Sequence, residues 1–566
     1  MNAIIRFASV TEKDVKNYQW HDEVCALGQS NPVVFNKGKT LAIISDATIY
    51  NLPELREELC AKGYACKAAS AEEVILQLYE LYGAKCVEHL RGMFALCIYD
   101  IPHKKLFVAR DRIGEKTLYY SQIPGGLVIS TDLKNILQNH IPSPQVNIHS
   151  LLEPLRYIAP LDMEQTWVQQ IKRLQPGCYL EFDESSFTIS QYWHTSRVPQ
   201  IECSREEALA RTLDLMQESV NLTMRGDKPI AIMLSGGVDS SAVASLAKRG
   251  GHEVHTITIG FGGEVEYDER AIARRLAEEK GFDHHEIVLN PEDYESAFED
   301  LMQYVDEPIT DSAVIAQWVL YKKVRELGYE VLLSGMGGDE LFYNYAWLNN
   351  QANARKLRHQ FDQICPVDTK ERKKQWLQMM RANWKALIMP QEWHKTNEST
   401  YIPWYHDEFE RFIKDATLRL NGREYQLRDY APHQRYPECP VGRELDQAYD
   451  DAFDRVMVGA YLYLGGKVAT ANGIEIRCPL IDHKLVEYAM RLSQDMVGLN
   501  KNFMKEALED ILPDYILHAP KCGFTPTSHY PQMVADTHAY KYFRTSAPFY
   551  PVAVADQMLI NLIQEK

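Results

Sequence analysis

The apolar segment 230–234, IAIML, runs directly into the polar loop 235–241, SGGVDSS. An apolar run, a pair of glycines and then small residues such as Ala242 and Ala244 predict a strand, a tight turn and a helix that begins near Ser240. Backbone NH groups at such a turn, together with the positive end of the helix, form an anion site. The pattern therefore favours an α/β fold that binds phosphate at this loop.

The side chains of this loop indicate a metal as well as a phosphate. Gly236 and Gly237 let phosphate oxygens approach the backbone, while Ser235, Ser240 and Ser241 can add hydroxyl donors. An acid beside a phosphate is repulsive unless a cation lies between them, so Asp239 is predicted to bind Mg²⁺. A purely structural turn between a strand and a helix is the alternative, and the aspartate is what favours the phosphate site.

Two other loop motifs do not fit these residues. A Walker loop needs a lysine directly after its last glycine, and none follows Gly237. A nucleophile elbow needs a glycine two positions before its serine, where this chain has Met233 before Ser235. The loop is therefore expected to hold phosphate in another way.

A second loop of the same kind follows the apolar segment VLL at 331–333 and reads SGMGGDE. Its acid, Asp339, comes where a helix could start. In a doubly wound sheet the loops at the carboxyl ends of neighbouring strands face one crevice, so Asp239 and Asp339 are predicted to share the metals of one polyphosphate. Two unrelated surface turns are the alternative.

Periodicity divides the chain into two parts. Up to about residue 193, short strand-like segments dominate, interrupted by one clear helical pattern over 70–90. From residue 204, amphipathic helices alternate with brief apolar strands, as in a parallel sheet flanked by helices. The polar segment 195–204 contains a proline and is predicted to be the linker, so the domains are expected at 1–199 and 200–566. The charged, Trp- and Tyr-rich tract 355–450 is predicted to form an all-helical lobe.

Composition favours a small-molecule enzyme. The chain has 78 acidic and 61 basic residues, a formal charge of −17, and no long basic run, which makes nucleic acid an unexpected partner. The 11 cysteines show no CxxC or zinc-type spacing, and no segment has the 18 or more apolar residues of a membrane helix. The first residues lack a signal-peptide pattern, so the protein is predicted to be cytoplasmic, with no membrane partner.

The motifs LSGGVDSS and SGMGGDELF, with the later blocks ANGIEIRCPLIDHKLVEYA and ILHAPKCGFTP, resemble the asparagine synthetase family. In the first half, LRGMFALCIYD, ARDRIGEKTLYY and RLQPGCYLEF resemble its class II glutaminase domain. The resemblance implies an αββα-layered glutaminase-like domain, then a doubly wound parallel-sheet ATP-pyrophosphatase domain with an added helical lobe. It also implies ATP and Mg²⁺ as cofactors and suggests a homodimer.

The resemblance implies a reaction in two steps. ATP and a carboxylate give an acyl-adenylate and pyrophosphate, and an amine then attacks to give an amide and AMP. Carried over by position, the implied roles are pyrophosphate binding for Ser235, Gly236, Gly237 and Ser240, Mg²⁺ binding for Asp239 and Asp339, adenosine binding for Leu234, Ile259, Ser334 and Gly335, and charge stabilisation during catalysis for Lys521.

The first domain departs from the glutaminase pattern. Such glutaminases need a cysteine directly after the initiator methionine, and position 2 is Asn2. Where the family reads NGEIYN this chain reads DATIYN from Asp46, and where it reads SDxE this chain reads SAEE from Ser70. Cys25 or Cys60 could replace the thiol but not its α-amine. The domain is therefore predicted to have lost glutamine hydrolysis, as in β-lactam synthetases and lasso-peptide cyclases.

The second loop also departs from the family. Asparagine synthetases place an acid, and β-lactam synthetases a tyrosine, where this chain has Met336, which cannot accept a proton. Glu340, Tyr343 and Tyr345 are nearby candidate bases, or they only cap and pack the helix. The leading hypothesis is an AMP-forming amide synthetase of specialised-metabolite or peptide biosynthesis that does not use glutamine. An asparagine synthetase that uses ammonia, either free or supplied by a partner, and an inactive scaffold are the alternatives.

Overall fold

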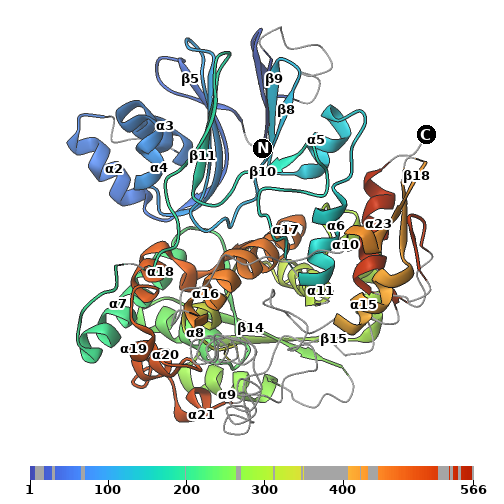
Figure 1. Ribbon diagram of the computed structural model, residues 1–566. Coiled ribbons are helices and arrows are strands. Elements are labelled where there is room, and N and C mark those ends of the chain that lie inside the picture. Colours follow the sequence, from blue (N-terminus) through green and yellow to red (C-terminus); the bar gives the residue numbers. More distant parts are fainter. Residues whose placement is uncertain are drawn as a thin grey trace, which may run out of the picture.

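The structure is a computed structural model in which an N-terminal sandwich of sheets stands above a larger α/β domain (Figure 1). It describes residues 1–6, 18–28, 32–64, 70–157, 159–197, 199–262, 269–309, 311, 313–345, 349, 406–420, 422–430, 444–519, 534–535, 540–545 and 550–563. Among these residues, no helix has the length and apolar character needed to span a membrane.

Two antiparallel six-stranded sheets face each other in the N-terminal domain. The first has the order β10-β8-β9-β1-β3-β2 and the second β12-β11-β7-β6-β5-β4. The strands of the first sheet are β1 (Asn2–Arg6), β2 (Trp20–His21), β3 (Cys25–Gly28), β8 (Tyr119–Ile123), β9 (Gly126–Ser130) and β10 (Lys172–Arg173). Those of the second are β4 (Val34–Phe35), β5 (Leu41–Ile49), β6 (Gly92–Asp100), β7 (Lys105–Arg110), β11 (Cys178–Phe182) and β12 (Phe187–Gln191).

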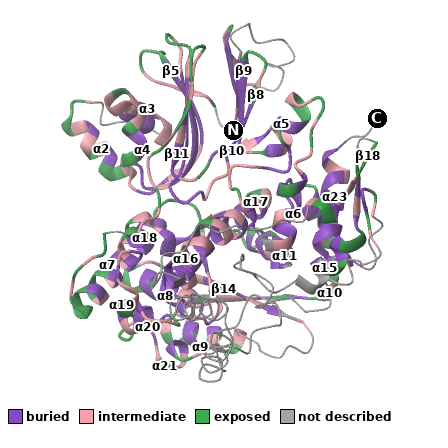
Figure 2. Cartoon of the chain, in the orientation of Figure 1, coloured by how far each residue is buried: buried purple, intermediate pink, exposed green. Residues whose placement is uncertain are grey.

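Helices cover the outer faces of this sandwich (Figures 1 and 2). They are α2 (Leu52–Ala61), α3 (Ala71–Tyr82) and α4 (Cys86–His89) against the second sheet, and α5 (Leu133–His140) and α6 (Ile148–Tyr157) on the side of the first. Strand β6 shows why both faces are buried, because Cys97 packs between the sheets while Phe94 and Ile98 pack against the helices. The predicted αββα layering is confirmed.

A five-stranded parallel sheet of order β15-β14-β13-β16-β19 forms the centre of the second domain. The chain proceeds outward from β13 to β15 on one side and returns to β16 on the other, so the switch point lies between β13 and β16. The strands are β13 (Ile230–Met233), β14 (His255–Phe261), β15 (Asp283–Leu289), β16 (Val331–Leu333) and β19 (Glu475–Arg477). The predicted doubly wound parallel sheet is confirmed.

Helices surround this sheet and pack on both of its faces. They include α7 (Arg205–Thr223), α8 (Val238–Arg249), α9 (Arg270–Lys280), α10 (Pro291–Met302), α11 (Ala313–Glu326), α12 (Gly338–Leu341), α16 (Glu444–Asp451), the π-helix η6 (Ala452–Leu462), α17 (Tyr463–Ala471), α18 (His483–Ala489) and α20 (Asn502–Ala507). Helix α7 begins with a capping box in which Ser204 accepts from the Glu207 amide and the Glu207 side chain accepts from Ser204. This cap fixes where the connecting segment ends.

The predicted lobe over 355–450 is only partly described. Helix α15 (His406–Asp415) is followed by the hairpin β17 (Thr417–Leu420) and β18 (Arg423–Gln426), which joins β20 (Phe543–Arg544) and packs near α23 (Tyr550–Leu562). The prediction of an all-helical segment is therefore wrong for 417–426. Leu418 and Leu420 are buried, and the charged residues between and after them hide this short alternation in the sequence. Residues 350–405 and 431–443 lie outside the described residues.

The two domains pack against each other through charged contacts. Arg91 donates from Nε and Nη2 to the two carboxylate oxygens of Asp482, at 2.7 and 2.8 Å. The Arg225 guanidinium donates to the carbonyl of Tyr50 at 3.0 Å. These contacts hold the sandwich beside the parallel sheet at several places along the chain.

Candidate active site

The first glycine loop lies between the end of β13 and the start of α8, with Gly237 as the N-cap of the helix. Gly236 has a φ of +78°, and a Cβ at that position would lie 2.9 Å from Cγ2 of Ile272 in α9. A side chain is therefore excluded at Gly236 by both conformation and packing. The result is a close turn that directs the first NH groups of α8 toward the carboxyl edge of the sheet.

The serines of this loop bond to each other. The Ser235 amide donates to Ser240 Oγ at 3.1 Å, the two hydroxyl oxygens are 3.1 Å apart, and the Gly237 amide lies 3.3 Å from Ser235 Oγ. These bonds close the turn. Their hydroxyl groups lie at the loop where the sequence predicts pyrophosphate.

The second loop follows β16 and touches the first. Strands β13 and β16 pair in parallel with Ile232 opposite Leu333, so both loops start at the same level of the sheet. A Cβ on Gly335 would lie 2.7 Å from the Ser240 amide nitrogen, and one on Gly338 would overlap the Asp239 carboxylate. The glycines of the second loop thus let it approach the aspartate of the first.

The predicted pair of aspartates is brought together around one lysine. Lys501, the N-cap of α20, binds Asp239 Oδ2 and also lies 2.6 Å from Asp339 Oδ1. Burial alone would lower the pKa of Lys501, but attraction and hydrogen bonds from the two carboxylates outweigh it and raise the pKa. The lysine is therefore charged and balances two carboxylates in a largely buried place. We call Asp239 and Asp339 the two-carboxylate site.

The donor set fits a hard divalent cation. Mg²⁺ prefers carboxylate oxygens and is usually held by one or two of them together with substrate phosphates. Asp339 is held in place by Asn344, whose Nδ2 donates to Asp339 Oδ1 at 2.6 Å and whose amide donates to the Asp339 carbonyl at 3.1 Å. Two oriented carboxylates beside a helix N-terminus could bind Mg²⁺ and a polyphosphate together.

Three residues with left-handed backbones surround this site. Tyr343, Asn500 and Lys501 have φ values of +52°, +60° and +58°. The amides of Asn500 and Lys501 donate to the carbonyls of Tyr343 and Phe342, at 2.9 and 3.0 Å. Each such conformation costs on the order of 1 kcal/mol in a residue other than glycine. The surrounding contacts must offset this cost, and the pairing places the Lys501 side chain at the carboxylates.

Among the candidate bases, Glu340 and Tyr345 form a pair. The Tyr345 hydroxyl donates to Glu340 Oε1 at 2.6 Å. Burial, and then the neighbouring Asp339, raise the pKa of Glu340 to about 7, while burial raises the pKa of Tyr345 well above its usual value. Met336 offers only a thioether that packs on the domain core.

The hydroxyl of Tyr343, the third candidate base, bonds to two other residues. It accepts from Arg197 Nη1 at 2.8 Å and donates to Asp446 Oδ1 at 2.9 Å. The phenol therefore bridges a cation and an acid. Of the three candidate bases, it is the one with a clear structural role.

The residues predicted to contact adenosine lie along the edge formed by β13, β14 and β16. Leu234 is buried in the core, and its amide donates to Ile257 O at 2.9 Å. Ile259 is half-buried on β14, and the Ser334 amide donates to Arg477 O at 2.9 Å. Their adenosine contacts remain predictions. Lys521 lies outside the described residues, so its predicted role also remains a prediction.

The positions that depart from the glutaminase pattern have other contacts. Asn2 accepts from Ser130 Oγ at 2.6 Å, and Asp46 pairs with Lys116 at 2.8 Å. Glu72 accepts from Ser45 Oγ at 2.9 Å. Each of these side chains is thus engaged within the sandwich or at its edge.

Neither alternative thiol is suited to nucleophilic attack. Burial raises the pKa of Cys25 well above its usual value, which keeps the thiol protonated. Cys60 is disulfide-bonded. The structure therefore offers no activated thiolate at either position.

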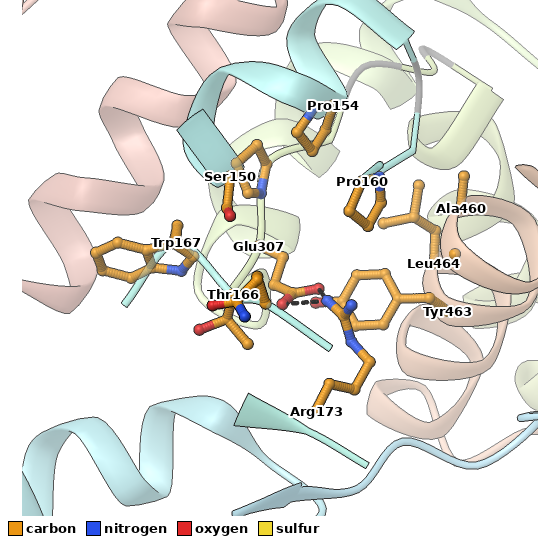
Figure 3. Close-up of a pocket in the computed structure, with 13 residues that line it drawn as sticks. Ser150, Pro154, Pro160, Thr166, Trp167, Arg173, Glu307, Ala460, Tyr463 and Leu464 are labelled. Atoms are coloured by element: carbon orange, nitrogen blue, oxygen red, sulfur yellow. Dashed lines mark hydrogen bonds and ion pairs between the residues drawn. The ribbon is translucent and has the colours of Figure 1, made fainter. Parts of the chain in front are cut away.

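A separate pocket lies between the domains. Figure 3 shows the guanidinium of Arg173 paired with the Glu307 carboxylate beneath a rim that includes Pro154, Pro160 and Leu464. Its residues come from the sandwich, the segment after α10 and the helix η6–α17, and none belongs to either glycine loop. Because its charged pair is satisfied internally, we assign the pocket no part in the two-carboxylate site.

The sequence motifs do not predict three residues of this region: Lys501, Asn344 and Arg197. None of them lies in a glycine loop, and each is recognisable only through its contact partner. One signal was available, since two acids predicted to lie together in a partly buried crevice require a nearby cation. That requirement calls for a lysine or an arginine but does not say where in the chain it is.

Two glycine loops at the switch point of a parallel sheet, with paired acids and a preceding αββα sandwich, define a nucleotide-dependent α/β synthetase with an amidotransferase-like domain. A family model described as asparagine synthase matches residues 211–547, and one described as a glutamine amidotransferase domain matches residues 24–193. Since the first match covers more than half of the 566 residues, the chain belongs to the asparagine synthase family. The family suggested by the motifs is confirmed.

Similar proteins that carry a name support the family assignment. Asparagine synthetase [glutamine-hydrolyzing] 1 of Bacillus subtilis is 26% identical over 499 residues, covering 87% of this chain and 77% of the relative. Amidase chyE of Penicillium rubens is 25% identical over 555 residues, covering 87% and 78%. A glutamine phosphoribosylpyrophosphate amidotransferase structure from B. subtilis is 11% identical and covers 51% of this chain and 74% of its own, with a TM-score of 0.24.

The family assignment places the chain in an enzyme class. It is an ATP-dependent carbon–nitrogen ligase that forms AMP and pyrophosphate, and it joins a carboxylate to an amine nitrogen. The predicted enzyme class is confirmed.

Proposed function

We propose that the enzyme adenylates a carboxylate and transfers the acyl group to an amine without using glutamine, in the biosynthesis of a specialised metabolite or peptide. The observation that carries the adenylation half is the convergence of Asp239 and Asp339 on Lys501. The two acids come from different loops, and only the fold brings them together. An inactive scaffold has no need for a buried cluster of three charges, which is costly to assemble.

In this proposal Asp239 and Asp339 hold Mg²⁺, which when bound would neutralise charge on the β- and γ-phosphates of ATP. Ser235, Gly236, Gly237 and Ser240 bind the departing pyrophosphate through backbone NH groups and hydroxyls at the start of α8. Lys501 lies between the carboxylates and supplies a cation to the same phosphates. Leu234, Ile259, Ser334 and Gly335 are proposed to contact adenosine, and Lys521 to stabilise charge during acyl transfer.

The nitrogen source is proposed to be an amine other than glutamine. At the position of the expected thiol the chain has an amide, Asn2, which is bonded to Ser130. Where the family pattern has an amide for the oxyanion hole, Asp46 places a carboxylate, and negative charge there would oppose an oxyanion rather than stabilise it. The ion pair of Asp46 with Lys116 gives this carboxylate a different partner.

The alternative is an asparagine synthetase that uses ammonia. The relatives named asparagine synthetase support asparagine formation, although their names state glutamine hydrolysis, whereas the relatives named amidase show that matching proteins do not all carry one name. The two functions differ in the acid that is activated.

The test is exchange of labelled pyrophosphate into ATP, with Mg²⁺ and a panel of carboxylic acids. Exchange that depends on an acid other than aspartate is the expected result. Exchange driven by aspartate, followed by asparagine formation from ammonia, would replace the proposal with the alternative. A complete absence of exchange with every acid, in protein shown to bind ATP, would contradict both.

A further inference from the structure

The segment that connects the two domains places a buried arginine beside the second loop. Arg197 lies between β12 and α7 and is 5% exposed. Its Nε donates to Asp450 Oδ1 at 2.6 Å and its Nη1 donates to the Tyr343 hydroxyl at 2.8 Å. The guanidinium carbon is also 5.3 Å from the centre of the Tyr343 ring. Two directed bonds and a cation–π contact therefore join this arginine to one tyrosine and one acid.

Tyr343 occupies a conformation that a tyrosine rarely adopts. Its φ is +52°, a backbone conformation that is disfavoured for residues with a bulky side chain. Besides Arg197, the hydroxyl bonds Asp446, and the ring packs edge-to-face on Tyr449 with centroids 4.7 Å apart. Such conformations persist when the surroundings fix them, and here the contacts fix the end of the side chain and its ring.

The backbone of the turn at Tyr343 also fixes the lysine of the two-carboxylate site. The carbonyls of Phe342 and Tyr343 accept from the amides of Lys501 and Asn500. The next residue, Asn344, donates to Asp339. One turn thus sets the position of Lys501 and of Asp339 together.

We infer that Arg197 is a positioning residue for the two-carboxylate site. By holding the Tyr343 phenol, it maintains the left-handed turn at 342–344, and through that turn the relative positions of Lys501 and Asp339. The inference rests on the proposed function where it concerns the metal and ATP. The contacts that link Arg197, Tyr343 and Lys501 do not depend on that function. This role of Arg197 also gives the sandwich domain a use that does not require glutamine, because its connecting segment supplies a part of the synthetase site.

Two readouts that do not require turnover test the inference. The first is the affinity of the full chain for Mn²⁺ in the presence of inorganic pyrophosphate, titrated by electron paramagnetic resonance. The second is hydrogen exchange at the amides of Asn500 and Lys501. In Arg197→Met we expect Mn²⁺ affinity to fall about tenfold, as for loss of other groups that orient a metal ligand. We also expect both amides to exchange faster.

Tyr343→Phe keeps the ring but removes the hydroxyl that Arg197 and Asp446 share. It should weaken Mn²⁺ binding to a similar degree, and the double variant should be little worse than either single one, because all three changes break the same link. Arg225→Met is the matched control. It also removes an arginine that bridges the domains, through Tyr50 and Glu54, and should leave both readouts unchanged.

Unchanged Mn²⁺ affinity in folded Arg197→Met, or effects of the two single changes that simply add, would overturn the inference. If Arg197→Met does not fold, Tyr343→Phe decides by the same criteria. Failure of the proposed function is separate, since the parent would then show no pyrophosphate exchange with any acid while the effect of Arg197 on Mn²⁺ affinity and amide exchange could still be measured. Where the parent does exchange, Arg197→Met should raise the Mg²⁺ needed for half-maximal rate and change the rate at saturating Mg²⁺ far less.

Discussion

Gly338, the first residue of α12, lies so close to Asp239 that a Cβ on the glycine would overlap the aspartate carboxylate. The contact joins the second loop to the first at the acid that is proposed to bind Mg²⁺. Because the neighbouring atoms belong to a carboxylate held by Lys501, they cannot move without disturbing the ion pair.

Gly338→Ala should therefore abolish activity while the protein stays folded. We expect pyrophosphate exchange to fall by about 100-fold, since the methyl group displaces a metal ligand. Gly465→Ala is the control, because, among the residues that the structure describes, its Cβ would be near only the Tyr321 hydroxyl, at 3.9 Å. Equal activity of the two variants would contradict the assigned loop contact.

Neutralising either acid should have the same effect on chemistry. Asp239→Asn and Asp339→Asn keep the shape of the side chain but remove the charge that Mg²⁺ and Lys501 require. We expect each to lower pyrophosphate exchange by about 100-fold or more and to weaken MgATP binding in calorimetry. Asp214→Asn, an exposed acid on α7, should behave as the parent does. Retained activity in Asp339→Asn would show that the second loop does not bind the metal.

Removing the lysine should make stability depend on divalent metal. Lys501→Met leaves two neighbouring carboxylates without their cation in a buried place, which costs about 3–5 kcal/mol. Bound Mg²⁺ would replace part of that charge, so the melting temperature of Lys501→Met should rise on adding Mg²⁺ by more than that of the parent. Thermal unfolding with and without Mg²⁺ measures this. No rise in the melting temperature of Lys501→Met on adding Mg²⁺ would mean that the carboxylates do not bind the ion.

The sandwich domain should not hydrolyse glutamine. Asn2 and Asp46 stand where the resemblance expects a thiol and an oxyanion-hole amide, and the Cys25 thiol is buried and protonated. Purified protein should release no glutamate from glutamine, with or without ATP and the acid substrate, in a coupled glutamate assay. Glutamate release that copurifies with the protein would show that the domain is active by another route.

His483 should make stability fall at acidic pH. Burial, followed by the positive charge of Arg112, lowers the pKa of His483 to about 3, against about 6.5 in an unfolded chain. Below pH 6.5 the His483 imidazole therefore binds a proton in the unfolded state but not in the folded state. The free energy of unfolding decreases as the pH falls, until the pH reaches about 3. His483→Gln should show a smaller decrease between pH 7 and pH 5 in denaturant unfolding. A slope equal to that of the parent would show that His483 is charged in the folded protein.

Local pattern was enough to predict much of the fold. Strand β6 is an almost continuous apolar segment, as expected of a strand buried on both faces, and the apolar segments before the glycine loops became β13 and β16. The approach of Asp239 to Asp339 also followed from the rule that neighbouring parallel strands end at one edge. These features depend on residues close in sequence or on topology alone.

The remaining features depend on contacts between distant segments. Strand β19 has three residues, Glu475–Arg477, too few to show a period, and it is defined by its pairing with β16. Lys501 and Arg197 act through turns that contain left-handed residues other than glycine. One of these residues is Tyr343, and a tyrosine adopts a positive φ less often than an asparagine does. Since propensity argues against such conformations, only the assembled structure reveals them.

The contact of Gly335 and Gly338 with the first loop has an evolutionary consequence. A change at either glycine alters the space available to Asp239 and Ser240, so the two loops cannot diverge independently even though about a hundred residues separate them in the sequence. Asp239, Gly335 and Gly338 should therefore be inherited together among descendants of this chain.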